Sequence, residues 1–286
     1  MLENNAEKLI KISVQGEAQH SYIGSPYRVD KEGQAHIVTA TGGIVHNVKV
    51  GDSAMGWVAD HLEPGVSVKN PDKLYNAAFN LYACLGNEAK IMTGEAKGNK
   101  GIVVGTHGGV DHVMVYFPED VLEEMALGDK IRVKACGQGL KLNNYPDVHI
   151  MNIDPDLFAK LGLEANGEKI KVPVTHIVPP YLMGSGIGTA TATKGDYDIM
   201  TTDSEEVAKH NLNTLRLGDV VLIQDWSNNY GRAYLKGAVT VGVVIHGDSF
   251  KMGHGPGVQV IMTAATELIE GVITPDANIA NYLGIK

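Results

Sequence analysis

Short apolar runs bounded by glycine dominate the hydrophobic pattern of this chain. Each run spans about four to eight residues, which is typical of β-strands and too short for most helices. The runs lie at 35–40, 43–50, 101–104, 112–117, 130–135, 169–174, 219–224, 239–245 and 258–262. Apolar residues recur at helical spacing only over 72–85, 118–127 and 154–161. The pattern therefore predicts a β-rich α+β protein with a few short helices.

A helix, a glycine turn and a strand follow one another once in each half of the chain, at 118–133 and at 154–174. This order is typical of closed β-structures with crossover connections and differs from a repeated βαβ sheet. We expect two barrel-like or sandwich-like β domains with short crossover helices. The polar segment 143–153 is the predicted junction, and it divides the chain into domains 1–147 and 148–286.

The dipeptide Gly-Asp introduces several predicted strands, with the aspartates at Asp52, Asp129 and Asp219. Glycine accepts a positive φ in a turn, and aspartate accepts backbone hydrogen bonds where a strand begins. We interpret these pairs as architecture.

Composition limits the possible partners. The 286-residue chain is 44% hydrophobic and has a formal net charge of -9. Nucleic acids and anionic membranes need clustered Lys and Arg, which are scattered here, so we expect neither as a partner. We expect a cytoplasmic protein, because the N-terminus lacks a signal-peptide pattern and no apolar stretch approaches the roughly 20 residues of a membrane span. Two cysteines exclude a zinc site built only of cysteines, whereas 11 histidines offer many imidazole ligands.

The most informative segment is the apolar strand 239–245 and the glycine-rich turn that follows it. His246 and Asp248 stand two residues apart at the strand end, so on an extended backbone both side chains point the same way. His254 lies between two glycines farther along the turn. Imidazole and carboxylate groups in this arrangement predict a metal site or a polarised water.

A second turn has the same design, because His107, Asp111 and His112 join two apolar strands through glycines. Histidine and aspartate form the ligand set of Zn²⁺ and similar divalent metals. We hypothesise that the fold brings both turns to one cleft. The alternative is a pair of hairpins whose polar side chains only hydrogen-bond the turn backbone.

Further polar clusters are weaker candidates. Asp196 and Asp198 share one face of an extended segment and are able to orient a histidine, bind a cation or act as a base. Arg232 is a candidate clamp for a substrate anion. The cluster of His46, Asp60 and His61 is interpreted as a polar loop, with a catalytic role as the alternative. Cys136 is interpreted as a buried thiol. The glycines at 184–188 do not form a phosphate loop in this interpretation, because no helix is expected after them.

Three motifs together resemble an uncharacterised prokaryotic family, domain of unknown function 4438. They are His107-Gly-Gly-Val-Asp-His112, Gly195-Asp-Tyr-Asp-Ile-Met-Thr-Thr-Asp203 and His246-Gly-Asp-Ser-Phe-Lys-Met-Gly-His-Gly-Pro-Gly257. The resemblance covers most of the chain. It implies a β-rich N-terminal domain and a β-rich C-terminal domain, and it brings no activity with it.

The strand 239–245 and its turn are also similar to a turn of the acetamidase and formamidase family, which reads Asp-x-His, a spacer and Gly-Asp-Gly-Glu. Here His246 and Asp248 occur in reversed order, the spacer is one residue longer, His254 replaces the second aspartate, and Pro256 stands where the glutamate would be. We carry over only the idea of a polar, metal-binding turn at the end of a buried strand.

These observations predict a metal-dependent enzyme that hydrolyses a C–N bond, in an amide or cyclic amide, of a small polar molecule. The expected ligands of the divalent metal, zinc in the first instance, are His246, Asp248, His107 and His112. Asp111 or His254 would move protons, and Arg232 would hold a substrate anion. Two alternatives stay open: a non-catalytic ligand-binding or assembly protein, and a metal-free lyase or isomerase that uses His and Asp as acid and base. A homo-oligomer is also expected.

Overall fold

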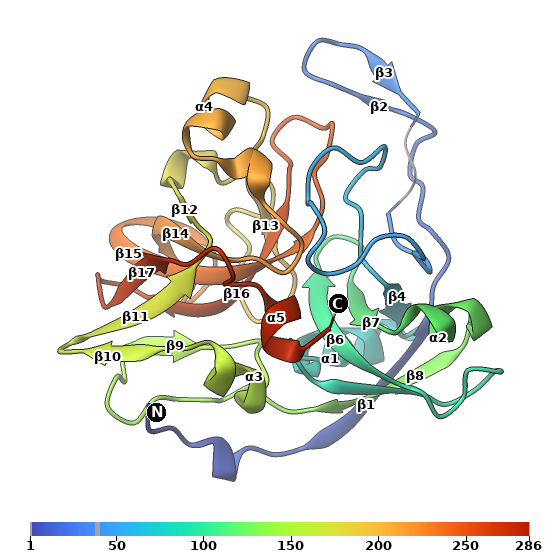
Figure 1. Ribbon diagram of the computed structural model, residues 1–286, viewed down its shortest axis with the longest axis horizontal. Helices are drawn as coiled ribbons and strands as arrows, with labels where there is room; N and C mark the ends of the chain where they lie inside the picture. The colour runs from blue at the N-terminus through green and yellow to red at the C-terminus, as the bar shows by residue number, and fades with distance from the viewer. Residues whose placement is uncertain (1, 38–40, 286) are drawn as a thin grey trace.

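The computed structural model describes residues 2–37 and 41–285. The N-terminal half forms a closed six-stranded barrel, and the C-terminal half is built around a six-stranded sheet (Figure 1). The predicted β-rich fold with short helices is therefore confirmed. In Figure 1 the barrel lies at the right and the second sheet at the left.

The barrel strands follow the order β1-β4-β7-β6-β5-β8, and β8 pairs with β1 to close the ring. Their bounds are Ile12–Ala18 (β1), Val66–Lys69 (β4), Glu88–Ile91 (β5), Lys100–His107 (β6), His112–Tyr116 (β7) and Lys130–Ala135 (β8). Helix α1, Lys73–Tyr82, begins after the capping Asp72 and buries Phe79 in the barrel core. Helix α2, Glu119–Glu124, connects β7 with β8.

A small hairpin of β2, Arg28–Val29, and β3, Ala35–His36, projects from the barrel (Figure 1). The strand predicted at 35–40 begins with β3, and its residues 38–40 lie outside the described residues. The strand predicted at 43–50 is wrong, because this segment is irregular. Gly42 and Gly43 have φ values of +83° and +103°, and this left-handed backbone cannot enter an extended strand.

The C-terminal sheet has the order β12-β14-β15-β16-β13, and β9 also pairs with β16. The bounds are Val148–Ile150 (β9), His176–Val178 (β12), Tyr197–Asp198 (β13), Val220–Ser227 (β14), Ala233–His246 (β15) and Gly257–Ala264 (β16). All residues of β16 are buried, as expected for an apolar strand covered on both faces.

A three-stranded sheet accompanies the larger one. It pairs β10 (Glu164–Asn166), β11 (Lys169–Val174) and β17 (Ile269–Ile273). The helices of this half are α3 (Pro155–Lys160), α4 (Ser204–Lys209) and α5 (Ile279–Leu283), and short 3-10 turns lie at Ala6–Lys8, Pro180–Leu182 and Leu212–Thr214. Within residues 2–37 and 41–285, no helix has the length and apolarity needed to cross a lipid bilayer.

The Gly-Asp turns have the architectural role expected of them. In each turn the glycine has a positive φ. The carboxylate of the following Asp52, Asp129 or Asp219 accepts the backbone N–H of the residue three positions earlier. Asp129 and Asp219 therefore fix the entries to β8 and β14, whereas Asp52 closes a turn that no strand follows directly.

The two halves meet where β6 packs against β15 and β16. Gln259 of β16 accepts from the backbone N–H of Thr106 at 2.9 Å and donates to the Thr106 hydroxyl at 2.7 Å, which ties β16 to β6. The chain passes from the barrel to the sheet between β8 and β9, the segment in which we expect the domain junction. The candidate site lies at this seam.

Candidate functional site

A cavity of about 470 Å³ lies at the seam between the barrel and the second sheet. His61 and His107 line it from the barrel half, and Asp196, Asp198 and His254 line it from the sheet half. The volume is within the range of small-molecule sites. Two groups of two histidines and one aspartate lie here, and within each group the ligand atoms lie within 4.8 Å of one another. Every member lines the cavity except His246, which is buried behind it.

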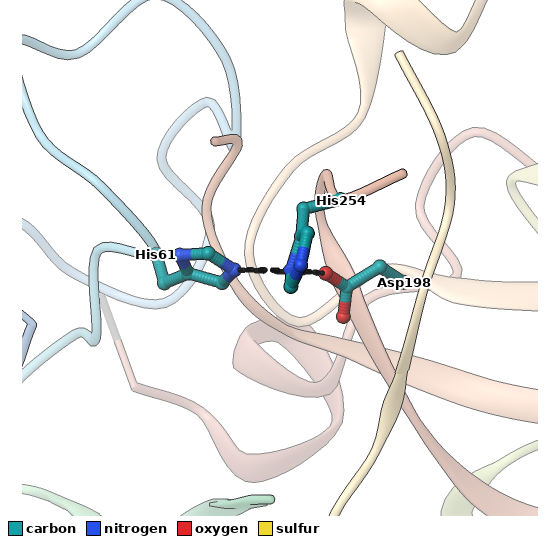
Figure 2. A group of neighbouring side chains, drawn as sticks. All are labelled: His61, Asp198 and His254. Atoms are coloured by element: carbon teal, nitrogen blue, oxygen red, sulfur yellow. Dashed lines mark hydrogen bonds and ion pairs between the residues drawn. The ribbon is translucent and has the colours of Figure 1, made fainter. Parts of the chain in front are cut away.

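The outer triad consists of His61, Asp198 and His254 (Figure 2). His254 Nδ1 lies 3.0 Å from His61 Nε2 and 3.0 Å from Asp198 Oδ2, and the last two atoms are 3.6 Å apart. Around a tetrahedral zinc ion with bonds of about 2.0–2.1 Å, neighbouring ligand atoms lie about 3.3 Å apart. The three atoms are therefore close enough to share one cation, and without a cation His61 and His254 hydrogen-bond each other.

His61 reaches the outer triad from an unusual backbone conformation in the loop before β4. Its φ is 52°, in the left-handed region that residues with a β-carbon rarely adopt. Its backbone N–H donates to Asp248 O at 3.0 Å, and its Nδ1 lies 3.2 Å from Asp60 Oδ1. Burial opposes protonation of His61, but its hydrogen bonds with Asp198 and Asp60 outweigh burial and raise its pKa to about 9. At neutral pH both ring nitrogens therefore carry hydrogens, and a cation that binds Nε2 would displace one proton. The contact of Nδ1 with Asp60 leaves Nε2 facing the triad.

The inner triad consists of His107, Asp196 and His246, all of them buried. His246 Nδ1 lies 2.8 Å from Gly247 O, and because a carbonyl only accepts, Nδ1 carries the hydrogen. Nε2 lies 2.8 Å from Asp196 Oδ2, but the angle does not suit a hydrogen bond, so this buried nitrogen has no such partner among the described residues. A nitrogen and an oxygen that both offer lone pairs, face the same point and do not hydrogen-bond each other are typical of cation ligands.

Asp196 is oriented by the barrel. Its Oδ1 accepts from the backbone N–H of Gly108 at 2.7 Å, which leaves Oδ2 to face His246. Complete burial opposes ionisation of Asp196, but attraction to His246 outweighs it and holds the pKa of this carboxyl below its usual range. Asp196 is therefore ionised and presents a carboxylate to His246.

Glu63 is the buried carboxylate behind the inner triad. Its Oε1 lies 2.5 Å from His107 Nδ1, its Oε2 lies 3.0 Å from His112 Nδ1, and the Ser67 hydroxyl also donates to Oε2. Burial opposes ionisation of Glu63, but the hydrogen bonds from His107 and His112 outweigh it and hold its pKa well below its usual range. His107 Nδ1 therefore donates to a carboxylate and leaves Nε2 available to bind a cation. Proteins orient metal-binding histidines by the same arrangement.

Gly257 has no side chain, and the inner triad occupies the space that a side chain would fill. It pairs with His246 in the ladder of β15 and β16, next to a register shift between Val244 and His246. A β-carbon at position 257 would lie 2.1 Å from both His246 Nε2 and Asp196 Oδ2. Only glycine allows the backbone to approach these atoms so closely.

Asp198 connects the two triads. Asp196 and Asp198 flank Tyr197 on an extended backbone, so their carboxylates point to the same side. Asp198 Oδ2 belongs to the outer triad, while Oδ1 lies 3.7 Å from His246 Nε2 of the inner triad. Its two oxygens thus face two different sets of histidines. This geometry suits two cations bridged by one carboxylate. In two-metal sites the two cations lie about 3.5–4 Å apart.

The structure brings together three of the residues singled out in the sequence as ligands or proton carriers, His107, His246 and His254. It does not bring His112 or Asp248 into either triad. His112 contacts Glu63 instead. Strand β15 ends at His246, so the extended geometry does not continue to Asp248, whose Oδ1 accepts from the Thr201 hydroxyl at 2.6 Å.

Arg232 and Asp111 both line the cavity outside the triads. The Asp111 side chain is 46% exposed and lies 3.9 Å from Lys194 Nζ, whereas Arg232 is buried. His46 lies at the surface beside Glu123. Cys136 is a buried free thiol that does not line this cavity, and burial raises its pKa.

Glu63 is the functional residue that sequence reasoning missed, and Asp198 and His61 were recognised only as members of polar clusters. The signal was present in Asp60-His61-Leu62-Glu63, where acidic and imidazole groups gather directly before a buried strand. Nothing in the local sequence relates this loop to the turn at 107–112, because only the pairing of β4 with β7 brings them together.

Comparisons with known proteins agree with the two-part fold. The N-terminal domain of unknown function DUF4438 matches residues 27–159, and the C-terminal DUF4438 domain matches residues 160–283. The crystal structure of TM1086 is similar to this chain with a TM-score of 0.95 and 48% sequence identity, over 98% of this chain and 99% of that chain. No curated protein matches. The chain therefore belongs to the DUF4438 family.

Proposed function

We propose that this chain is a metal-dependent hydrolase that cleaves a C–N bond, in an amide or cyclic amide, of a small polar molecule. The convergence of two His₂Asp triads at one cavity carries the proposal. Glu63 behind His107, Asp60 behind His61 and Gly247 O behind His246 each fix one ring nitrogen. Metal-binding histidines use such hydrogen-bond partners to fix the orientation of the ring. A histidine that only lies in a turn does not need them.

Zinc is the divalent metal that the donor set favours. Each triad offers two imidazole nitrogens and one carboxylate oxygen, and catalytic zinc takes three such ligands and keeps one position open. The bridging position of Asp198 favours a pair of metal ions over a single ion.

The chemistry requires an activated water and a route for one proton. Bound divalent ions polarise a carbonyl and lower the pKa of water towards neutrality. The water oxygen bonds to the carbonyl carbon, the C–N bond breaks, and one water proton ends on the departing nitrogen. Asp111 lines the cavity outside both triads and is our choice to carry that proton. His254 lies within the outer triad, so we assign it to metal binding instead.

The choice of a C–N bond rests on the segment from β15 to β16. This strand and glycine-rich turn resemble those of the acetamidase and formamidase family, and here they supply His246, His254 and the space at Gly257. The ligand order differs from that family, so the resemblance supports the reaction class and not a particular substrate.

His246→Ala tests the proposal. We expect the variant to lose inner-triad metal and hydrolysis of small amides together, while it stays folded, because the removed ring is a ligand. His149→Ala is the matched control, since His149 is exposed on β9 and pairs with Thr263, at the opposite end of β16 from Gly257. Measurements are metal content by mass spectrometry, amide hydrolysis and thermal unfolding. Unchanged metal content would remove His246 from the ligand set, and full activity of metal-free protein would contradict the proposal.

A further inference from the structure

Arg232 carries a buried charge at the wall of the cavity. Arg232 is only 3% exposed, and it lines the same cavity as His61, His107 and His254. Its Nη2 donates to Lys194 O at 3.0 Å and its Nη1 to Gly186 O at 3.5 Å, while the buried Nε has no partner among the described residues. A guanidinium has five N–H donors, so these two bonds leave three unused.

No carboxylate of the described residues lies within 4.0 Å of the Arg232 guanidinium. Asp196 and Asp198 act on it only at longer range, and burial lowers the pKa of the guanidinium. In the proposed function both carboxylates bind cations, so they do not neutralise Arg232. A buried charge without a partner is costly, and such groups persist where a ligand supplies the missing charge.

The fold holds Arg232 rigidly at a fixed place relative to the triads. Its backbone N–H donates to Thr189 O at 3.0 Å, and its carbonyl accepts from Gly188 N at 2.9 Å. Its Cζ lies 5.4 Å from the ring centroid of the buried Tyr197, which stands between Asp196 and Asp198. The same strand therefore positions both the metal ligands and the surface on which the guanidinium rests.

We infer that Arg232 binds a carboxylate of the substrate, so that the substrate class is a small amide or cyclic amide that carries a carboxylate. The inference rests on the proposed function. The planar guanidinium matches the two oxygens of a carboxylate, and Lys194 at the cavity wall adds positive charge. The triads would receive the amide end of the molecule while Arg232 receives the acid end.

Hydroxamates test this inference without knowledge of the substrate, because the hydroxamate group binds the metal itself. We would compare butyrohydroxamate, which is neutral at its far end, with succinohydroxamate of equal length, and extend the comparison to malono- and glutaro- homologues. The zinc-loaded full chain should bind at least one ω-carboxylate probe about tenfold or more tightly than the alkyl probe of the same length. Calorimetry measures both affinities.

Variants identify the residue responsible. Arg232→Met should abolish the preference, Arg232→Lys should retain part of it, and Arg132→Met should keep it, because Arg132 is exposed on β8. Thermal unfolding reports whether each variant folds, and the wild-type comparison needs no variant.

Each outcome gives a decision. If zinc-loaded wild type binds acid and alkyl probes equally, the carboxylate site is overturned while the metal site stands. A stronger preference for an ω-phosphonate hydroxamate would overturn the carboxylate assignment in favour of a phosphate group. If no hydroxamate binds at all, the proposed function fails and the inference fails with it.

Discussion

Replacing Glu63 by Gln tests the organisation of the inner triad most finely. Glu63 accepts from His107 Nδ1, His112 Nδ1 and the Ser67 hydroxyl, so both of its oxygens are in use. An amide keeps one oxygen and replaces the other with a nitrogen that only donates. At least one of these three donors then loses its acceptor, and His107 loses the charge that orients it and makes it a stronger ligand.

The expected magnitude follows from the role of Glu63 as an outer carboxylate. Loss of such a partner lowers metal affinity by about 10–100-fold, which corresponds to about 1.4–2.7 kcal/mol. The buried donor left without an acceptor should also lower the free energy of unfolding of the metal-free protein by about 1–3 kcal/mol. Among the described residues, the ring nitrogens of His61 and His254 contact each other, Asp60 and Asp198 but not Glu63, so the metal affinity of the outer triad should change little.

Zinc competition against a chromophoric chelator measures the affinities, and urea unfolding measures stability. Glu88→Gln is the control, because Glu88 is an exposed carboxylate whose ion pair with Lys100, at 2.8 Å, lies at the surface. Its replacement should leave both quantities unchanged. Zinc affinity within about twofold of wild type in Glu63→Gln, with unchanged unfolding, would refute the role of Glu63 as an orienting residue.

Two further predictions concern the same cluster. Gly257→Ala places a methyl group 2.1 Å from His246 Nε2 and Asp196 Oδ2. Metal analysis of this variant should therefore show loss of inner-triad metal while outer-triad metal remains. Equal occupancy of the two triads would contradict this prediction. Because the pKa of Glu63 is held below its usual value, its ionisation stabilises the metal-free fold above the ordinary glutamate pKa of about 4.3, and this contribution is lost as pH falls through that region. The unfolding free energies of wild type and Glu63→Gln should therefore converge as pH decreases below about 4, and a constant difference would exclude a charged Glu63.

The fold was predictable where local chemistry decides structure. The apolar run 239–245 became the core of β15, and the glycine and aspartate of each Gly-Asp turn behave as their conformational preferences require. The strand expected at 43–50 failed because paired glycines allow backbone angles that no hydrophobic pattern reveals. The strand was expected from the hydrophobic pattern of 43–50 alone, and that pattern does not include the left-handed backbone that Gly42 and Gly43 adopt.

The site was predictable only in part. His107 and His254 line one cavity, and the ring of the buried His246 lies 4.2 Å from the ring of His107. The idea that the two turns meet at one cleft agrees with this arrangement. Asp248 does not join the triad of His246, because the strand ends before it and the extended geometry assumed for the pair does not continue. Glu63 was overlooked, because its contacts arise from the pairing of β4 with β7 and not from sequence spacing.

The most direct test of the account is the metal stoichiometry of the untagged wild-type chain. The protein would be equilibrated with zinc, freed of excess ion and analysed by inductively coupled plasma mass spectrometry. The two triads predict about two zinc ions per chain, with a matching rise in thermal stability. A chain that retains no divalent metal and gains no stability from zinc, manganese or cobalt would contradict the metal-dependent hydrolase, and the acid–base and ligand-binding alternatives would then take its place.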